Sequence, residues 1–500
     1  MLDAGGELEP AIDARVAALS GRLPDQWTTA ERDALRGPLR YNNEGAPLKL
    51  AFGSDYVYRD TDALQPVVTE GVDAYRALAS GGLSALWGAA ILPYSDADFD
   101  GWPVTAAAMH RHYVSALQLT GLAADDDGLA RIYPLHVPPT ATLDVSAQAR
   151  ALMSRMAQHA EPLRRRHVYF GKARLAVGES SGDVRSCVHC GMCLYGCPYG
   201  LIYSARTTLR TRLAPSERFR YVPGVIVRTL TEGPGRVTIE GVARDTRQPH
   251  RVDASRVYLA TGALASTAIL LASLRDQAAP VTFAQSDHFL LPMLLQKAPR
   301  GAAHERLHTL SQIFLEVLDP EISRRGVHLQ IYTYNDLYTR MAQEKLGRLY
   351  PLVAPAVARL IDRVAVVKGY LHSAESAGIR ATLESGSDAR LRLSAVPNPS
   401  ADRAIGAVTR LLSRSRGEIG ATPIRLGLRK GLPGSGVHVG GSFPMRQRPG
   451  ALQTDVLGVP TGFTRVHVVD ATTFPTMPAA PPTLTIMANA FRIAEASCSS

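Results

Sequence analysis

Apolar positions near the end of the chain follow two different periods. Residues 466–469 (VHVV) form a short, mostly β-branched run that ends in Asp470, which predicts a buried strand with a carboxylate at its C-terminal end. A proline pair follows at 481–482, and apolar residues then recur every three or four positions, at Leu484, Met487 and Phe491. This order predicts a helix that starts at the prolines, with the unpaired N–H groups of its first turn facing the preceding segment.

Two segments near the middle of the chain predict further regular structure. Residues 221–230 alternate in polarity and predict a strand, and residues 257–271 (VYLATGALASTAILL) predict a strand, a turn at Gly262 and a helix. Strands that alternate with helices indicate an α/β fold. Because any α/β core contains such units, this one by itself indicates only that the sheet continues.

The pattern changes between residues 290 and 437. Strand-like runs at 312–318 and 328–334 alternate with loops, and helical patterns occupy 335–365 and 400–415. This region contains no chemical motif. We expect His288, His308 and His328 to be surface or structural residues, and His467 in the later strand to be a packed one.

Composition is that of a globular protein with two or more domains. The 500 residues are 46% hydrophobic and 20% charged, both ordinary values. The chain has 55 basic and 45 acidic residues, a net charge of +10, but these charges are scattered. The short basic cluster at 164–166 predicts a solvated surface, so we expect no nucleic-acid partner.

No segment is long and apolar enough to predict a transmembrane helix. The apolar segment 352–367 is interrupted by Arg359, Asp362 and Arg363 at helical spacing. It therefore predicts an amphipathic, partly buried helix.

Four of the five cysteines lie close together, at Cys187, Cys190, Cys193 and Cys197. Their C-x2-C-x2-C-x3-C-P spacing is that of bacterial ferredoxins, where thiolates of one loop converge on an iron–sulfur cluster. A zinc site and a disulfide-clamped loop are the alternatives. We expect Cys498, near the C-terminus, to take no part.

Two glycine pairs accompany polar side chains. Gly81 and Gly82 precede Ser84, an arrangement that suits a loop or helix start whose N–H groups face phosphate. A second pair, at 440–441, follows His438 and lets backbone approach a neighbour closely because no Cβ intervenes.

Together these segments resemble one flavoprotein family. The order HVGGSFPM at 438–445, the strand that ends in Asp470 and the proline-started helix resembles the C-terminal signature of the glucose–methanol–choline (GMC) flavin oxidoreductases. GGLSALWG at 81–88, followed by Asp98-Phe99 and Trp102-Pro103, resembles that family's first signature.

The resemblance implies an α/β fold in which a Rossmann-like FAD-binding domain, incomplete at its N-terminus, is interleaved with an antiparallel-sheet substrate domain. The first domain would comprise residues 1–20, 70–130, 215–285 and 438–500, and the second residues 290–437. A cysteine-rich loop would occupy 180–205.

The resemblance also implies functional residues. His438 matches the family's catalytic base, and the FAD contacts would be Asp3, Gly81, Gly82, Ser84, Val227, Asp470, Ala471, Pro482 and Thr483. The family's second active-site residue, a histidine or asparagine, falls at Pro481, which can neither donate a hydrogen bond nor take a proton.

The start of the chain resembles the end of the second strand of a dinucleotide-binding fold. There an acidic residue, here Asp3, bonds the adenosine ribose. We expect the first strand and its G-x-G-x-x-G turn upstream of Met1, together with any export signal. The location is therefore expected to be cytoplasmic or periplasmic.

The implied activity is FAD-dependent oxidation of a CH–OH group of a small-molecule alcohol, such as a sugar or polyol. Cys187, Cys193 and Cys197-Pro198 match the spacing in the catalytic subunit of bacterial FAD-dependent glucose dehydrogenases, which carry an iron–sulfur cluster. Electrons would then pass through such a cluster to an external acceptor. A flavin lyase of the hydroxynitrile-lyase type and a flavin-free inactive homologue are the alternatives.

Overall fold

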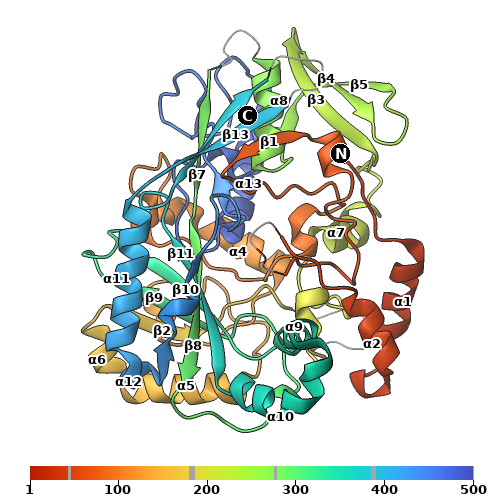
Figure 1. The fold of residues 1–500 in the computed structure, drawn as a ribbon. Coiled ribbons are helices and arrows are strands. Elements are labelled where there is room, and N and C mark those ends of the chain that lie inside the picture. The colour runs from red at the N-terminus through yellow and green to blue at the C-terminus, as the bar shows by residue number, and fades with distance from the viewer. Residues whose placement is uncertain (43–44, 46, 179–185, 275–278, 385–389, 499–500) are drawn as a thin grey trace.

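The computed structural model describes residues 1–42, 45, 47–178, 186–274, 279–384 and 390–498. Residues 180–185 of the predicted cysteine-rich loop lie outside this description. Figure 1 shows strands at the centre and top of the molecule and helices around them. The helices are α1 (Pro10–Ser20), α2 (Thr29–Arg36), α3 (Thr61–Leu64), α4 (Ala106–Thr120), α5 (Ala147–Gln158), α6 (Ala160–Arg164), α7 (Ala205–Thr208), α8 (Ala263–Ser273), α9 (Asp336–Leu346), α10 (Tyr350–Ile361), α11 (Ser400–Arg414), α12 (Arg416–Ile419) and α13 (Thr483–Cys498).

The strands form four sheets. A seven-stranded sheet has the order β14-β8-β11-β10-β9-β2, with β15 also pairing to β8, and a five-stranded sheet has the order β1-β13-β12-β7-β16. The remaining sheets are β3-β4-β5 and the pair β17-β6. The strands are β1 (Val67–Glu70), β2 (Val168–Lys172), β3 (Val225–Gly233), β4 (Arg236–Ala243), β5 (Pro249–Ala254), β6 (Val257–Leu259), β7 (Val281–Gln285), β8 (His288–Leu295), β9 (Ile313–Val317), β10 (Val327–Tyr332), β11 (Val364–Leu371), β12 (Gly378–Leu383), β13 (Leu391–Val396), β14 (Ala421–Pro423), β15 (Arg429–Lys430), β16 (Val439–Gly440) and β17 (Val466–Val468).

The seven-stranded sheet has two different faces. Side chains alternate along a strand, so Val327, Leu329 and Ile331 of β10 lie on one face. They belong to a buried core with residues of α5, α11 and α12. The intervening β10 residues, His328, Gln330 and Tyr332, therefore lie on the opposite face. That polar face belongs to the candidate site.

The predicted strand–turn–helix around Gly262 is present. β6 ends before the turn, α8 follows it, and β6 pairs in parallel with β17, the strand predicted before Asp470. Apart from isolated bridges, the described residues show parallel pairing only here and between β1 and β13. The other ladders are antiparallel, as expected for the substrate region.

The predicted C-terminal helix is α13, which packs on α4. Leu484 is buried, whereas Phe491, expected on the same apolar face, is 38% exposed. The pattern was therefore right for the helix and wrong for one of its three apolar positions.

Predicted elements in the middle of the chain are mostly confirmed, with one division. The runs at 312–318 and 328–334 are β9 and β10, and the pattern at 400–415 is α11. The pattern at 335–365 divides into α9 and α10, because Gly347 ends α9 with a positive φ of 49°. None of the described helices combines the length and apolar character of a bilayer span.

Candidate active site around His438

His438 stands at the edge of the five-stranded sheet, directly before β16. Its carbonyl oxygen accepts a hydrogen bond from Ser286 N at 3.0 Å, which anchors the backbone. Its ring stacks on Tyr370 of β11, with centroids 4.6 Å apart and an interplanar angle of 19°. Nδ1 has no hydrogen-bond partner among the described residues. The ring is held in orientation while one nitrogen remains available.

The environment keeps this ring neutral. Burial, and then the positive charge of Lys368, lower the pKa of His438 to about 3. A neutral imidazole can carry its proton on Nε2 and leave Nδ1 as an acceptor. His438 is therefore unprotonated near neutral pH, the state in which a general base starts, but its low pKa makes it a weak base.

A row of polar side chains crosses the sheet beside Tyr370. Strand register places His328 between Glu316 and Tyr370, and Tyr370 between His328 and His288. The Nδ1 atom of His328 lies 2.6 Å from Glu316 Oε1. All four residues are buried. His288 and His328 are thus structural parts of the sheet and not surface residues.

The row continues as a hydrogen-bonded chain. Tyr332 Oη donates to Gln330 Oε1 at 2.9 Å, and Gln330 Nε2 lies 3.1 Å from His328 Nε2. If the amide donates here, His328 carries its proton on Nδ1 and donates it to Glu316. The chain therefore fixes the polar face of β10 from Tyr332 to Glu316.

Two lysines approach the same place. Lys368 Nζ lies 5.2 Å from the centroid of Tyr370, and Lys49 Nζ donates to Trp87 O at 2.8 Å. Burial lowers the pKa of Lys49 to about 8, and the charge of Lys368 acts in the same direction. The charge of Lys368 therefore acts on both Lys49 and His438.

Asp470 joins two segments of the chain through hydrogen bonds. Its Oδ2 accepts from Gly262 N at 2.9 Å and Ser266 Oγ at 2.5 Å, and its Oδ1 accepts from Thr472 N at 2.9 Å. Burial raises the pKa of this carboxyl group, and these hydrogen bonds oppose the shift. Asp470 ties the start of α8 to the turn after β17.

The glycine pair after His438 contacts the turn after β17 that Asp470 also holds. A Cβ on Gly440 would collide with Ala471 O, and Gly441 N donates to that oxygen at 2.9 Å. The close approach that these glycines allow is thus made by the 471–473 turn of the chain itself. Ala471 is buried in this contact.

The loop at Gly81 and Gly82 has left-handed backbone, with φ of 82° and 58°. No atom lies within 4 Å of a Cβ built on Gly82, so the space beside it is open. Ser84 Oγ donates to Gly81 O at 2.6 Å and accepts from Ala205 N at 3.0 Å. Ser84 fixes the loop, and Gly82 leaves room next to it.

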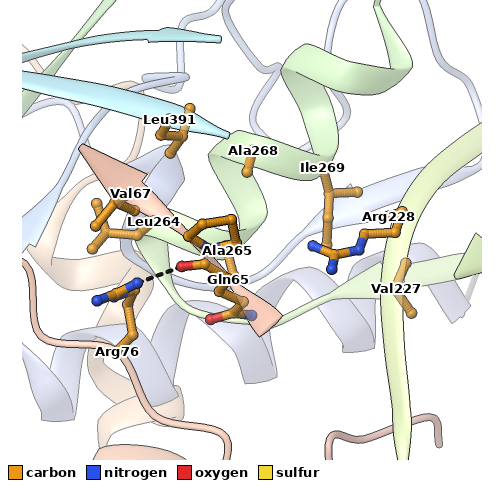
Figure 2. A pocket seen from close by; sticks show the side chains of 11 residues that line it. Gln65, Val67, Arg76, Val227, Arg228, Leu264, Ala265, Ala268, Ile269 and Leu391 are labelled. Carbon is orange, nitrogen blue, oxygen red and sulfur yellow. Dashed lines mark hydrogen bonds between the residues drawn. The ribbon is translucent and has the colours of Figure 1, made fainter. Parts of the chain in front are cut away.

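Asp3 is bonded to the start of β3, the strand that contains Val227. Asp3 O accepts from Val225 N at 2.9 Å, at the start of β3, and Asp3 Oδ1 accepts from Gly5 N and Tyr221 Oη. Val227 lines an open pocket of about 440 Å³ between β1, β3 and α8 (Figure 2). Its walls are mostly apolar, and Arg76, which donates to Gln65 O, stands at its rim.

The four clustered cysteines do not form a metal site in the described residues. All are free thiols, and no group of three His, Cys, Asp or Glu side chains is arranged for a metal ion. They pack in or against the apolar core, where burial raises the pKa of each thiol, for Cys187 to about 12. The structure therefore gives no support to the predicted iron–sulfur or zinc set. It shows no disulfide among them either.

The sequence did not predict the residues that β10 and β11 contribute to this site. Lys368, Tyr370 and Gln330 carry no motif, and only the alternation of polar residues along β10 and β11 marks them. Pro481 and Pro482 are buried before α13, and Thr483 is its first residue. Pro481 supplies no side-chain hydrogen bond, as expected.

No known family model and no curated protein matches this sequence. Solved structures do match. Pyridoxine 4-oxidase from Mesorbium loti has a TM-score of 0.56 and 16% identity, over 100% of this chain and 94% of that one. An FAD-dependent oxidoreductase from Chaetomium thermophilum, in complex with a fragment, has a TM-score of 0.56 and 13% identity, over 100% and 98%. Similarity at this level concerns the fold, which is that of the GMC flavin oxidoreductases. The predicted fold is confirmed.

Proposed function

We propose that this protein is an FAD-dependent oxidoreductase that oxidises a CH–OH group, with His438 as the base. The observation that carries the proposal is the state of His438, whose neutral ring is stacked on Tyr370 and has Nδ1 without a partner. The fold shared with two FAD-dependent enzymes supports it independently.

The described residues fit FAD at three places. Gly82 leaves open space at its loop, and Val227 lines an open pocket. Thr483 starts a helix of 16 residues, whose first-turn N–H groups have no partner within the helix. When bound, FAD supplies the hydride acceptor.

Individual residues would have different tasks. Asp3 and Val227 would contact the adenosine end, and the loop of Gly81, Gly82 and Ser84 the diphosphate. Asp470 and Ala471 hold the turn after β17, and Pro482 and Thr483, at the start of α13, would stand at the flavin ring. Ser84 and Asp470 are already hydrogen-bonded within the chain, so their main task is to position backbone.

His438 would remove the hydroxyl proton while the substrate carbon loses its hydride. Protonation of a ring with so low a pKa is unfavourable, so the proton must pass onward quickly or be stabilised by the bound substrate. The polar row of β10 and β11 would hold the other substrate hydroxyls, which favours a polyol or sugar as the substrate. An external electron acceptor completes the cycle.

Anaerobic reduction of the flavin tests this function. The protein is loaded with FAD and mixed with a series of alcohols and sugars, and the flavin band near ~450 nm is followed. We expect bleaching by at least one substrate, and its loss in His438→Asn with FAD still bound. If no alcohol reduces the bound flavin but the loaded protein cleaves a cyanohydrin, the protein is a lyase instead. Failure to bind FAD would overturn the proposal.

A further inference from the structure

An apolar stripe on the solvent side of α10 is the feature of this molecule that the proposed function leaves unexplained. Leu352, Val353 and Leu360 of α10 are 79%, 38% and 56% exposed, and Leu349, in the turn directly before the helix, is 61% exposed. Their spacing of three, four and seven residues places them on one side of the helix. In α10 only Ile361 is buried. Figure 1 shows α10 at the lower edge of the molecule.

This arrangement reverses the usual orientation of a surface helix. An amphipathic helix normally turns its apolar stripe to the core, because burial of one leucine side chain gains about 1.5–3 kcal/mol. Here the stripe lies in water. The amphipathic helix predicted at 352–367 was too long, because α10 ends at Ile361 and residues 364–367 belong to β11. Contiguous exposed apolar surface of this kind marks a contact with another partner.

Charges around the stripe are positive. Lys345, Arg348 and Arg359 are exposed and form no ion pair with a described residue. The whole chain has a net charge of +10. Basic side chains beside an exposed apolar stripe fit a surface that is itself apolar and negative.

Acidic side chains of the same segment form an ion pair or hydrogen bonds within the protein. Asp336 is paired with Arg36 at 2.6 Å, and Glu344 accepts from Tyr41 Oη. Asp362 accepts from Gly301 N and Ala302 N at 3.0 and 2.8 Å. Arg36 balances the charge of Asp336, whereas the partners of Glu344 and Asp362 are neutral donors. Two negative charges therefore offset part, but not all, of the positive charge of Lys345, Arg348 and Arg359.

We propose that α10 docks the protein on an anionic lipid bilayer. The helix would lie in the interface with Leu352 and Leu360 among the acyl chains, and Arg348 and Arg359 would meet lipid phosphates. Its 12 residues are too few to cross the bilayer, so the contact is peripheral. The proposal does not depend on the flavin or on His438.

Vesicle co-sedimentation of the whole protein tests this docking. Vesicles of phosphatidylcholine alone are compared with vesicles that also contain phosphatidylserine, at low and high salt. We expect binding to the anionic vesicles that weakens with salt. Leu352→Ser with Leu360→Ser should reduce the binding constant by at least about tenfold.

A matched control separates the stripe from surface hydrophobicity in general. Leu426 is 102% exposed and lies outside α10, so Leu426→Ser should leave binding unchanged. Arg348→Gln with Arg359→Gln should weaken binding to anionic vesicles and reduce its salt dependence. The stripe residues are exposed, so these variants should keep the wild-type unfolding midpoint.

Three results would overturn the proposal. One is wild-type protein that ignores anionic vesicles, and another is a stripe variant that binds as well as wild type. The third is a dimer in sedimentation equilibrium that the two serine substitutions dissociate, without vesicle binding. That result would assign the stripe to a second copy of the chain.

Discussion

Tyr370 stacks on His438, with ring centroids 4.6 Å apart, and this contact fixes the plane of the candidate base. Among the described residues no hydrogen bond of the Tyr370 hydroxyl accompanies the stacking, and burial raises the pKa of this hydroxyl above its ordinary value. The ring should therefore matter more than the hydroxyl. We predict that Tyr370→Leu lowers kcat by about 10–100-fold, because a misdirected base loses part of its general-base contribution.

The conservative variant is the control for this prediction. Tyr370→Phe keeps the ring and should change kcat by less than about threefold. Stopped-flow reduction of the loaded enzyme measures both variants. A phenylalanine variant as slow as the leucine variant would contradict the role assigned to the ring.

Lys368 should set the acid side of the pH profile. Its charge is the second cause, after burial, of the low pKa of His438. Without that charge the pKa rises but stays below the ordinary value of 6.5, because burial remains. We predict that Lys368→Met moves the acid limb of kcat/KM to higher pH, since activity requires the neutral ring and is lost as pH falls through its pKa.

Lys297 supplies a control with the same change of charge. It is exposed, and Lys297→Met should leave the acid limb in place. An acid limb that both variants shift equally would indicate net charge as the cause. A limb that neither variant moves would remove Lys368 from the environment of the base.

The sequence predicted one half of the candidate site, at the C-terminal end of the chain, but not the other half, on β10 and β11. His438, Asp470 and the helix start lie within 46 residues, and their order along the chain is itself the signal. Tyr370 and His328 meet because β10 pairs with β11. Register across two strands depends on packing that no local pattern encodes, so this polar row could not be predicted.

Two other features show what spacing and periodicity leave undetermined. The cysteine spacing suits a cluster, but it does not say whether the thiols turn toward one another or into the apolar core, where they lie. The period of α10 predicts an apolar stripe, but the same period serves a helix on the core and a helix in water. Burial is decided by the rest of the fold.

Asp470 should be important for stability as well as for the site. Its Oδ2 accepts from two donors, Gly262 N and Ser266 Oγ, and the side chain is 8% exposed. The amide of Asp470→Asn has one oxygen and one NH2 group, so a buried donor would lose its acceptor. We predict a loss of about 2 kcal/mol in the free energy of unfolding, measured in urea.

A half-buried aspartate whose hydrogen bond is exposed to water is the control. Asp319 Oδ1 accepts from Glu321 N at 3.0 Å at the surface, where water can replace it. Asp319→Asn should change the free energy of unfolding by less than about 0.5 kcal/mol. Equal effects of the two substitutions would mean that burial of Asp470 adds nothing.

Val437, immediately before His438, has a φ of 65°, a conformation that costs a β-branched residue about 1–2 kcal/mol. Asparagine tolerates this conformation, and Val437 is 44% exposed, so little burial is lost on substitution. We predict that Val437→Asn raises the free energy of unfolding by about 1 kcal/mol. Val396 is 41% exposed in strand β13 without a positive φ, so Val396→Asn should lower that free energy instead. Urea unfolding of both variants decides the matter, and a loss of stability in both would show that the backbone before His438 is unstrained.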